Sequence, residues 1–126
     1  MARVIVNARN YMFADMIRLA LRDNGDFHVT VVGKPEKVID EFNRTAANIV
    51  LMEVASGTPW TMWERMALRE IIHRIDPHCK IALLVDEREE KRLAEQVVRA
   101  KLDGLIDQFI YTSISATYLV ALMSTL

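Results

Sequence analysis

The sequence contains a single cysteine, Cys79, among its 126 residues. One cysteine excludes an internal disulfide and is typical of a protein that works in a reducing compartment. Proline and glycine are also scarce, with 3 and 4 residues. The sequence contains no repeats, low-complexity segments or internal linkers. The net charge of −1 shows no excess of one sign, so the composition does not indicate a surface for nucleic acid or membrane. The apolar stretch near the N-terminus is too short for a signal peptide or a membrane span. We therefore expect a cytoplasmic protein.

The remaining composition is that of an ordinary compact domain. Hydrophobic residues make up 52% of the chain and charged residues 26%. A chain of this length fits one domain, and it can bury roughly two thirds of the surface that its unfolded form exposes. We therefore expect residues 1–126 to form a single domain.

The stretch 48–54, with the sequence Asn-Ile-Val-Leu-Met-Glu-Val, is the most informative part of the chain. An unbroken apolar run of this length is typical of a strand buried on both faces, as in parallel sheets flanked by helices. Open parallel sheets bind their ligands outside the carboxyl ends of the strands. Glu53 is therefore predicted to lie where a functional site would be, although an acid at a strand end can also be merely solvated.

Strands and helices are predicted to alternate five times along the chain. The predicted strands are 3–6, 27–32, 48–54, 80–85 and 104–106, and the predicted helices are about 10–24, 35–42, 60–75, 86–101 and 113–126. Short connections and right-handed crossovers leave few topologies for such a pattern. We predict an α/β fold, a flavodoxin-like doubly wound parallel sheet with strand order 2-1-3-4-5.

Several residues indicate where these elements begin and end. Asn10 is expected to cap the first helix and Asn24-Gly25 to end it, because both residue types at the end tolerate a left-handed conformation. Thr112 or Ser113 is expected to cap the last helix. The strand 27–32 has more alternating polarity than the others, which indicates a position near the sheet edge.

The whole chain resembles the receiver domain of two-component response regulators, the CheY-like family. The resemblance is carried by Val4-Ile5-Val6, by the run from Ile49 to Glu53, by Asp76-Pro77-His78 and by Leu102-Asp103-Gly104. It implies the same fold. It also implies a phosphorelay function, in which a histidine kinase transfers a phosphoryl group to an aspartate that ends strand three.

The acidic part of that family's site is altered in this sequence. Glu53 matches the phosphoacceptor aspartate, and its carboxylate stands one methylene farther from the backbone, which disturbs near-attack geometry. The two adjacent acids that hold magnesium in the family match Asn7 and Ala8. Magnesium is bound by hard oxygens in strict octahedral geometry, and Asn7 supplies one neutral oxygen while Ala8 supplies none.

The remaining positions of the site are altered as well. The hydroxyl that ends strand four in the family matches Val85, which cannot hydrogen-bond to a phosphoryl oxygen. The lysine that follows strand five matches Gln108, although Asp107 also fits. The aromatic residue within strand five matches Leu105. Because phosphoryl transfer depends on positioning and charge stabilisation, these changes together predict a degenerate receiver, or pseudo-receiver, with no enzymatic activity, no cofactor and no metal.

Our leading hypothesis is a phosphorylation-independent signalling module that acts by protein–protein contact or dimerisation, such as the regulatory part of a transcription regulator. One alternative is a residual phosphoacceptor that uses Glu53, and another is that Glu53 permanently mimics a phosphorylated aspartate. A third is a small-ligand sensor at the strand ends. The loop 7–11 has no glycine to cradle a phosphate, but Arg9 could meet an anion.

Two aromatic clusters are candidates for partner surfaces, since aromatic residues and Met are enriched in interface cores. The resemblance implies a partner or homodimer surface on helix four, strand five and helix five, here comprising Leu105, Phe109, Ile110, Tyr111, Ile114 and Tyr118. Trp60 and Trp63 lie in a second cluster, in a loop longer than usual that is expected to close over the site, or else to pack in the core.

His73, His78 and Cys79 are residue types that bind zinc and lie close together in the sequence. No fourth ligand is evident, so we expect no zinc site.

Overall fold

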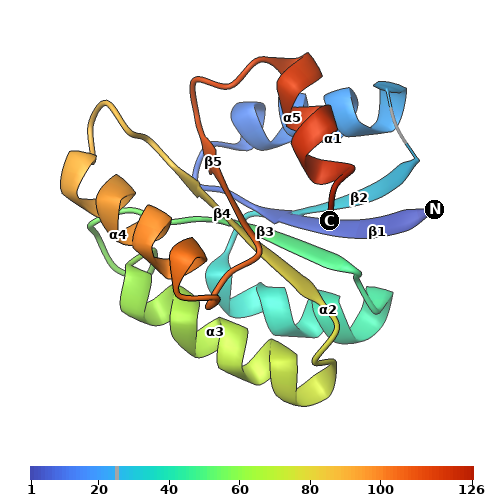
Figure 1. Cartoon of the computed structure of the whole chain (residues 1–126). Helices are drawn as coiled ribbons and strands as arrows, with labels where there is room; N and C mark the ends of the chain where they lie inside the picture. Colours follow the sequence, from blue (N-terminus) through green and yellow to red (C-terminus); the bar gives the residue numbers. More distant parts are fainter. Residues whose placement is uncertain (25) are drawn as a thin grey trace.

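Five parallel strands form one sheet in the order β2-β1-β3-β4-β5 in the computed structural model, which describes residues 1–24 and 26–126 (Figure 1). The strands are β1 (Ala2–Asn7), β2 (Phe27–Val32), β3 (Ile49–Glu53), β4 (Lys80–Val85) and β5 (Gln108–Tyr111). The predicted flavodoxin-like topology is confirmed, and the alternating strand β2 lies at an edge as predicted.

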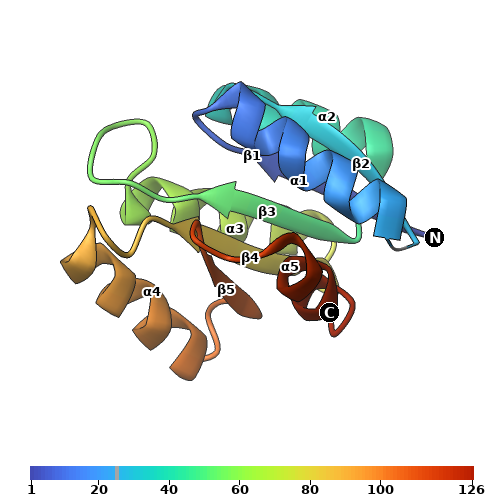
Figure 2. The same ribbon diagram turned by 90° about the horizontal axis from the view of Figure 1, so that it is seen from above.

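Helices cover both faces of this sheet (Figures 1 and 2). They are α1 (Tyr11–Asn24), α2 (Val38–Thr45), α3 (Met62–Ile75), α4 (Lys91–Leu102) and α5 (Ala116–Met123), with a short 3₁₀ helix, η1 (Pro35–Lys37), before α2. Helices α1 and α5 pack on one face, and α2, α3 and α4 pack on the other. In the described ranges, no helix is both long enough and apolar enough to span a membrane.

The strand β3 is the middle strand of the sheet, and every one of its residues is buried. Its side chains alternate between the two layers: Val50 and Met52 face α2, α3 and α4, while Ile49 and Leu51 face α1 and α5. This explains why an uninterrupted apolar run was needed, since neither face of β3 contacts water. Glu53 is the only charged residue of the strand, and it lies at the carboxyl end.

Two predicted elements need correction. The fifth strand is Gln108–Tyr111 rather than 104–106, so Leu105 lies outside it. Gly104 has a positive φ of 75° and turns the chain after α4, which leaves Leu105 and Ile106 to connect the helix to the strand. Helix α4 begins at Lys91 rather than residue 86, because Asp86 accepts hydrogen bonds from the backbone N–H groups of the turn that follows it.

The helix termini agree only in part with expectation. Asn10 does accept a hydrogen bond from the backbone N–H of Phe13, at 3.1 Å. The predicted helix end at Asn24-Gly25 falls partly on residue 25, which lies outside the described residues. Helix α5 is capped by Ser115 instead of Thr112 or Ser113, because the Ser115 hydroxyl accepts from the N–H of Tyr118.

The start of α3 is fixed by a capping box. The Thr61 hydroxyl oxygen accepts from the N–H of Glu64, whose carboxylate in turn accepts from the N–H of Thr61. Trp60 therefore lies in the loop before the helix, five residues before the first buried residue of α3, Arg65.

Candidate functional site

The carboxyl ends of β1, β3 and β4 bring together four of the five residues predicted for the degenerate pocket. Asn7, Ala8, Glu53 and Val85 all end or directly follow a strand there, and all four are buried. Gln108 does not join them, because it begins β5 and pairs in register with Ala82. This prediction was wrong as a result of the misplaced fifth strand. Tyr111 ends β5 opposite Val85, at the strand end where the resemblance places the family's lysine.

The carboxylate of Glu53 is fully engaged within the chain. Its Oε1 accepts a hydrogen bond of 2.7 Å from the backbone N–H of Arg9, and its Oε2 lies 3.0 Å from both Nε and Nη2 of the Arg9 side chain. Glu53 is only 6% exposed, so it is not a solvated acid at a strand end. The anion that Arg9 meets is therefore an internal one.

A buried arginine, Arg65, occupies the other side of the pocket. It is 0% exposed and reaches from α3 to the end of β1, where its Nη1 donates to Oδ1 of Asn7 at 2.7 Å. Its Nη2 donates to the backbone carbonyl of Pro59 at 3.1 Å. Asn7 is held in turn, since its Nδ2 donates to the carbonyl of Val32 at 2.7 Å.

Arg65 was missed in the sequence, although one signal pointed to it. The apolar stripe of α3 includes Leu68 and Ile72, and Arg65 lies on the same stripe one turn earlier. A charged residue on the inward stripe of a helix must meet a partner in the interior, because an unpaired buried charge is strongly unfavourable.

Burial lowers the pKa of Arg65 from its ordinary value to about 10, while the nearby carboxylates of Glu64 and Glu53 act in the opposite direction. At neutral pH the side chain therefore stays protonated. The pocket contains a permanent positive charge supplied by the chain itself, and the oxygen of Asn7 is directed at that charge.

The loop between β3 and α3 contacts this arginine through Pro59 and Trp60. The Trp60 ring lies 5.1 Å from the guanidinium carbon of Arg65, within the range of a cation–π contact. Trp63, in contrast, is 79% exposed on the first turn of α3. The two tryptophans therefore have different environments: Trp60 is partly buried against Arg65, and Trp63 faces solvent.

These residues do not fit the magnesium ion that the receiver resemblance implies. Magnesium needs several hard oxygen ligands, mostly free carboxylates or waters. Both oxygens of Glu53 are bonded to Arg9, and the oxygen of Asn7 is bonded to Arg65. Across residues 1–24 and 26–126, no group of three or more His, Cys, Asp or Glu side chains is arranged to hold a metal ion.

Two of the three candidate zinc ligands, His73 and Cys79, are poorly suited to bind a metal ion. The Nε2 atom of His73 lies 2.9 Å from the backbone carbonyl of Cys79. Burial, with smaller contributions from Asp76 and Asp107, raises the pKa of the Cys79 thiol to about 12, so the thiolate is disfavoured.

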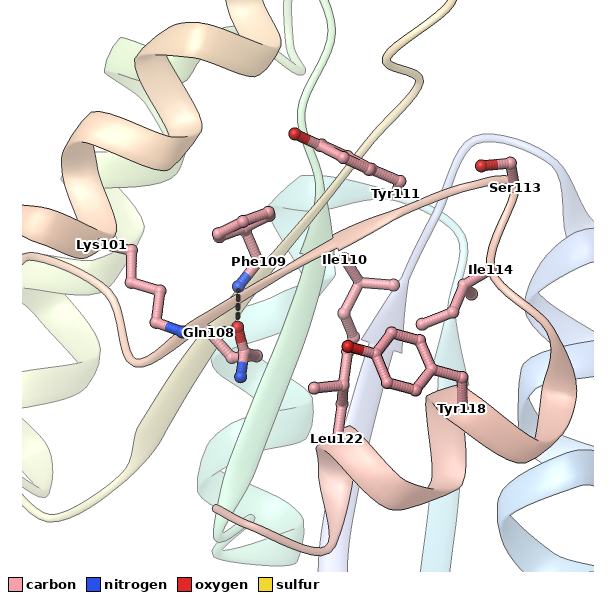
Figure 3. Close-up of a pocket in the computed structure, with 9 residues that line it drawn as sticks. All are labelled: Lys101, Gln108, Phe109, Ile110, Tyr111, Ser113, Ile114, Tyr118 and Leu122. Atoms are coloured by element: carbon pink, nitrogen blue, oxygen red, sulfur yellow. Dashed lines mark hydrogen bonds between the residues drawn. The ribbon is translucent and has the colours of Figure 1, made fainter.

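Five of the six residues predicted for the partner surface line a depression between β5 and α5 (Figure 3). The cavity has a volume of about 440 Å³ and is lined by Lys101, Gln108, Phe109, Ile110, Tyr111, Ser113, Ile114, Tyr118 and Leu122. Leu105 does not line it; this residue is 42% exposed and contributes to a separate depression between α3 and α4.

Aromatic rings and one cation give this depression its character. The rings of Phe109 and Tyr111 have centroids 5.4 Å apart, and Tyr118 is 60% exposed on α5. Lys101 closes one end, where its Nζ donates to Oε1 of Gln108 at 2.9 Å and lies 5.5 Å from the Phe109 ring centroid. The surface is therefore an apolar groove with a positive charge at one end.

No family model matches this sequence, and no curated protein matches it. Solved structures do match its fold. The structure of NtrX from Brucella abortus aligns with a TM-score of 0.78 at 15% identity, over 98% of this chain and 26% of that chain. A CheY-like response regulator receiver domain protein from Methanospirillum hungatei JF-1 aligns with a TM-score of 0.78 at 14% identity, over 99% and 92%.

A third similar structure is a CheY-like protein, tadZ, from Pseudomonas aeruginosa PAO1, with a TM-score of 0.74 at 18% identity over 99% of this chain and 98% of that chain. The chain thus spans about a quarter of the NtrX chain but nearly all of the two CheY-like proteins. At identities this low, the similarity shows that the fold is CheY-like.

Proposed function

We propose that this protein is a receiver-like signalling module that works without phosphorylation, in the cytoplasm, by contact with another protein. It is not an enzyme in this proposal. Its strand-end pocket holds the fold together, and its working surface is the face made by α4, β5 and α5.

The first half of the proposal rests on one observation. Two arginines of the chain itself, Arg65 and Arg9, place their positive charges at the strand-end pocket. A phosphoacceptor needs a free carboxylate and a metal ion beside it, so that charge on the phosphoryl group is neutralised as it moves. Here the carboxylate of Glu53 is already neutralised by Arg9. A divalent cation would have to enter beside the buried guanidinium of Arg65, where like charges repel.

The test is incubation with acetyl phosphate and magnesium, followed by intact mass, together with amide NMR spectra in beryllofluoride and magnesium. We expect no phosphoryl adduct and no shift of the signals of residues near Glu53. The variant Glu53→Asp should behave in the same way, because Arg65 still fills the pocket. A stoichiometric adduct in the wild-type protein, or magnesium-dependent spectral changes near residue 53, would refute the proposal.

The second half rests on the groove between β5 and α5. Its aromatic lining is typical of interface cores, and the volume of about 440 Å³ can accept a bulky apolar side chain. The positive charge of Lys101 at one end favours a partner segment that carries an acidic residue beside its apolar anchor. Homodimerisation through this face is a further form of the same proposal.

Site-specific cross-linking tests the groove. A photoreactive aromatic amino acid in place of Tyr118 should cross-link to a partner in the source cell and give one discrete adduct. The matched control is Met12, which is 76% exposed on α1 and lies outside the groove. Equal adducts at both positions, or none at position 118, would contradict docking at this face.

A further inference from the structure

Helix α3 lies between α2 and α4 in its layer (Figures 1 and 2), and it has a row of exposed apolar residues. The row consists of Trp63, Ala67, Ile71 and Ile75, each four residues from the next. Trp63 is 79% exposed, Ile71 is 40% exposed and Ile75 is 49% exposed, and Ala67 is exposed as well. None of these residues belongs to the groove between β5 and α5.

Such a row has the geometry of a helix-packing ridge. Side chains four residues apart form ridges that pack into the grooves of another helix, and a small residue within the ridge allows close approach. Beside this ridge lies a depression of about 290 Å³ between α3 and the segments around Pro35 and Pro59. The surface thus presents a ridge and a groove side by side, as a self-complementary contact requires.

We propose that α3 pairs antiparallel with α3 of a second copy across a twofold axis that passes near residue 69. In an isologous contact of this kind, Ala67 faces Ile71 of the partner subunit, and Trp63 faces Ile75 of the partner subunit. The same contacts repeat on the other side of the axis. The four apolar residues of each copy are then covered by the four of its partner.

The charges beside the ridge fit this register. Glu64 comes to lie next to Arg74 of the partner subunit, and Arg74 next to the partner's Glu64. Arg74 is available for such a pair, because no carboxylate of residues 1–24 or 26–126 lies within 4.0 Å of its guanidinium, whereas Arg69 contacts Glu70. Two symmetric ion pairs at the rim would fix the alignment of the helices.

Neighbouring registers are less favourable. With Ala67 on the axis, Glu64 would lie next to Glu70 of the partner subunit, and two like-charge contacts would result. With Ile71 on the axis, Trp63 would extend past the end of the partner's helix and stay exposed. The charge pattern therefore favours a second copy in one register over a general hydrophobic contact.

Sedimentation equilibrium over a wide concentration range tests the proposal, since a contact that rests on one helix is expected to be weak. The wild-type protein should dimerise reversibly. Ile71→Glu, which places a charge near the axis, should remain monomeric at every concentration, while Tyr118→Glu should dimerise like the wild type. Circular dichroism of each variant checks that the fold is retained.

The charge pairs give a second, register-specific test. Arg74→Glu should weaken dimerisation at least tenfold, and the double variant Glu64→Lys with Arg74→Glu should recover it, because the double variant restores opposite charges. Glu64 also belongs to the capping box of α3, so dimerisation of the double variant is compared at a temperature where all variants are fully folded.

A monomeric wild type, or a dimer broken by Tyr118→Glu and not by Ile71→Glu, would overturn the proposal. An unchanged dimer in Arg74→Glu would overturn it too. None of these results bears on phosphorylation. A dimer broken by Tyr118→Glu and not by Ile71→Glu would place the twofold contact at the groove between β5 and α5 instead of at α3, so failure here is distinct from failure of the proposed function.

Discussion

Replacing Arg65 with methionine is the most direct perturbation of the pocket. Methionine has a similar length and no charge, so the substitution removes three contacts with little change in volume. The losses are the hydrogen bond to Asn7 at 2.7 Å, the hydrogen bond to the Pro59 carbonyl at 3.1 Å and the cation–π contact with Trp60. The substitution also leaves Oδ1 of Asn7 buried without its donor.

The free-energy change is a difference between two effects. Hydrogen bonds to a charged group contribute about 1.5–3 kcal/mol each, and a desolvated cation–π contact contributes up to about 2 kcal/mol. Against this, the fold disfavours the charged form of Arg65. The lowering of its pKa to about 10 corresponds to about 3 kcal/mol, which methionine would relieve. We expect a net destabilisation of about 2–4 kcal/mol.

Urea unfolding followed by far-UV circular dichroism measures this difference directly. The melting temperature should fall by about 10 °C, given the size of the domain. Arg74→Met is the matched control, because Arg74 is an exposed arginine on the same helix, and it should change the stability by less than about 0.5 kcal/mol at low protein concentration.

The reasoning fails if Arg65→Met is as stable as the wild-type protein or more stable. That result is known for some buried ion clusters replaced by hydrophobic residues, where desolvation outweighs the contacts. It would mean that Arg65 is kept for a reason other than stability, and that filling the pocket with a cation does not secure the fold.

Three further predictions concern the same residues and their surroundings. Because burial lowers the folded-state pKa of Arg65 to about 10, the unfolded chain binds more protons than the folded chain near and above pH 10. The stability difference between wild type and Arg65→Met, measured by urea unfolding, should therefore grow as pH rises from 9 to 11, and a shrinking difference would contradict the sign. Glu53→Gln should lose about 1–2 kcal/mol of stability with its ion pair to the partly exposed Arg9, whereas Asp23→Asn, in a fully surface pair, should lose less than about 0.5 kcal/mol. Equal losses would argue against a special role for the Glu53–Arg9 pair. Cys79 should not react with thiol reagents at pH 8 in the native protein and should react at once in denaturant, because its pKa is raised to about 12; rapid native labelling would contradict this environment.

The order of the strands could be predicted from the sequence because short connections and right-handed crossovers leave few topologies for five alternating strands and helices. The continuous apolar run of β3 and the more alternating β2 reflect burial on two faces and a place at the sheet edge, and these patterns are visible residue by residue. The fifth strand was misplaced because Gly104-Leu105-Ile106 has the composition of a strand. Its actual position, Gln108–Tyr111, is decided by pairing with β4.

The sequence by itself determined that Asn7, Ala8, Glu53 and Val85 would meet at one end of the sheet, because parallel strands align their carboxyl ends. Only the tertiary structure decided what fills the space between them. Arg65 is 58 residues from Asn7 along the chain, and its guanidinium reaches that oxygen because α3 packs across the sheet with residue 65 facing inward. The inward stripe of α3 indicates that Arg65 is buried, but the partner of its hydrogen bond depends on distances in space, which the spacing along the sequence does not encode.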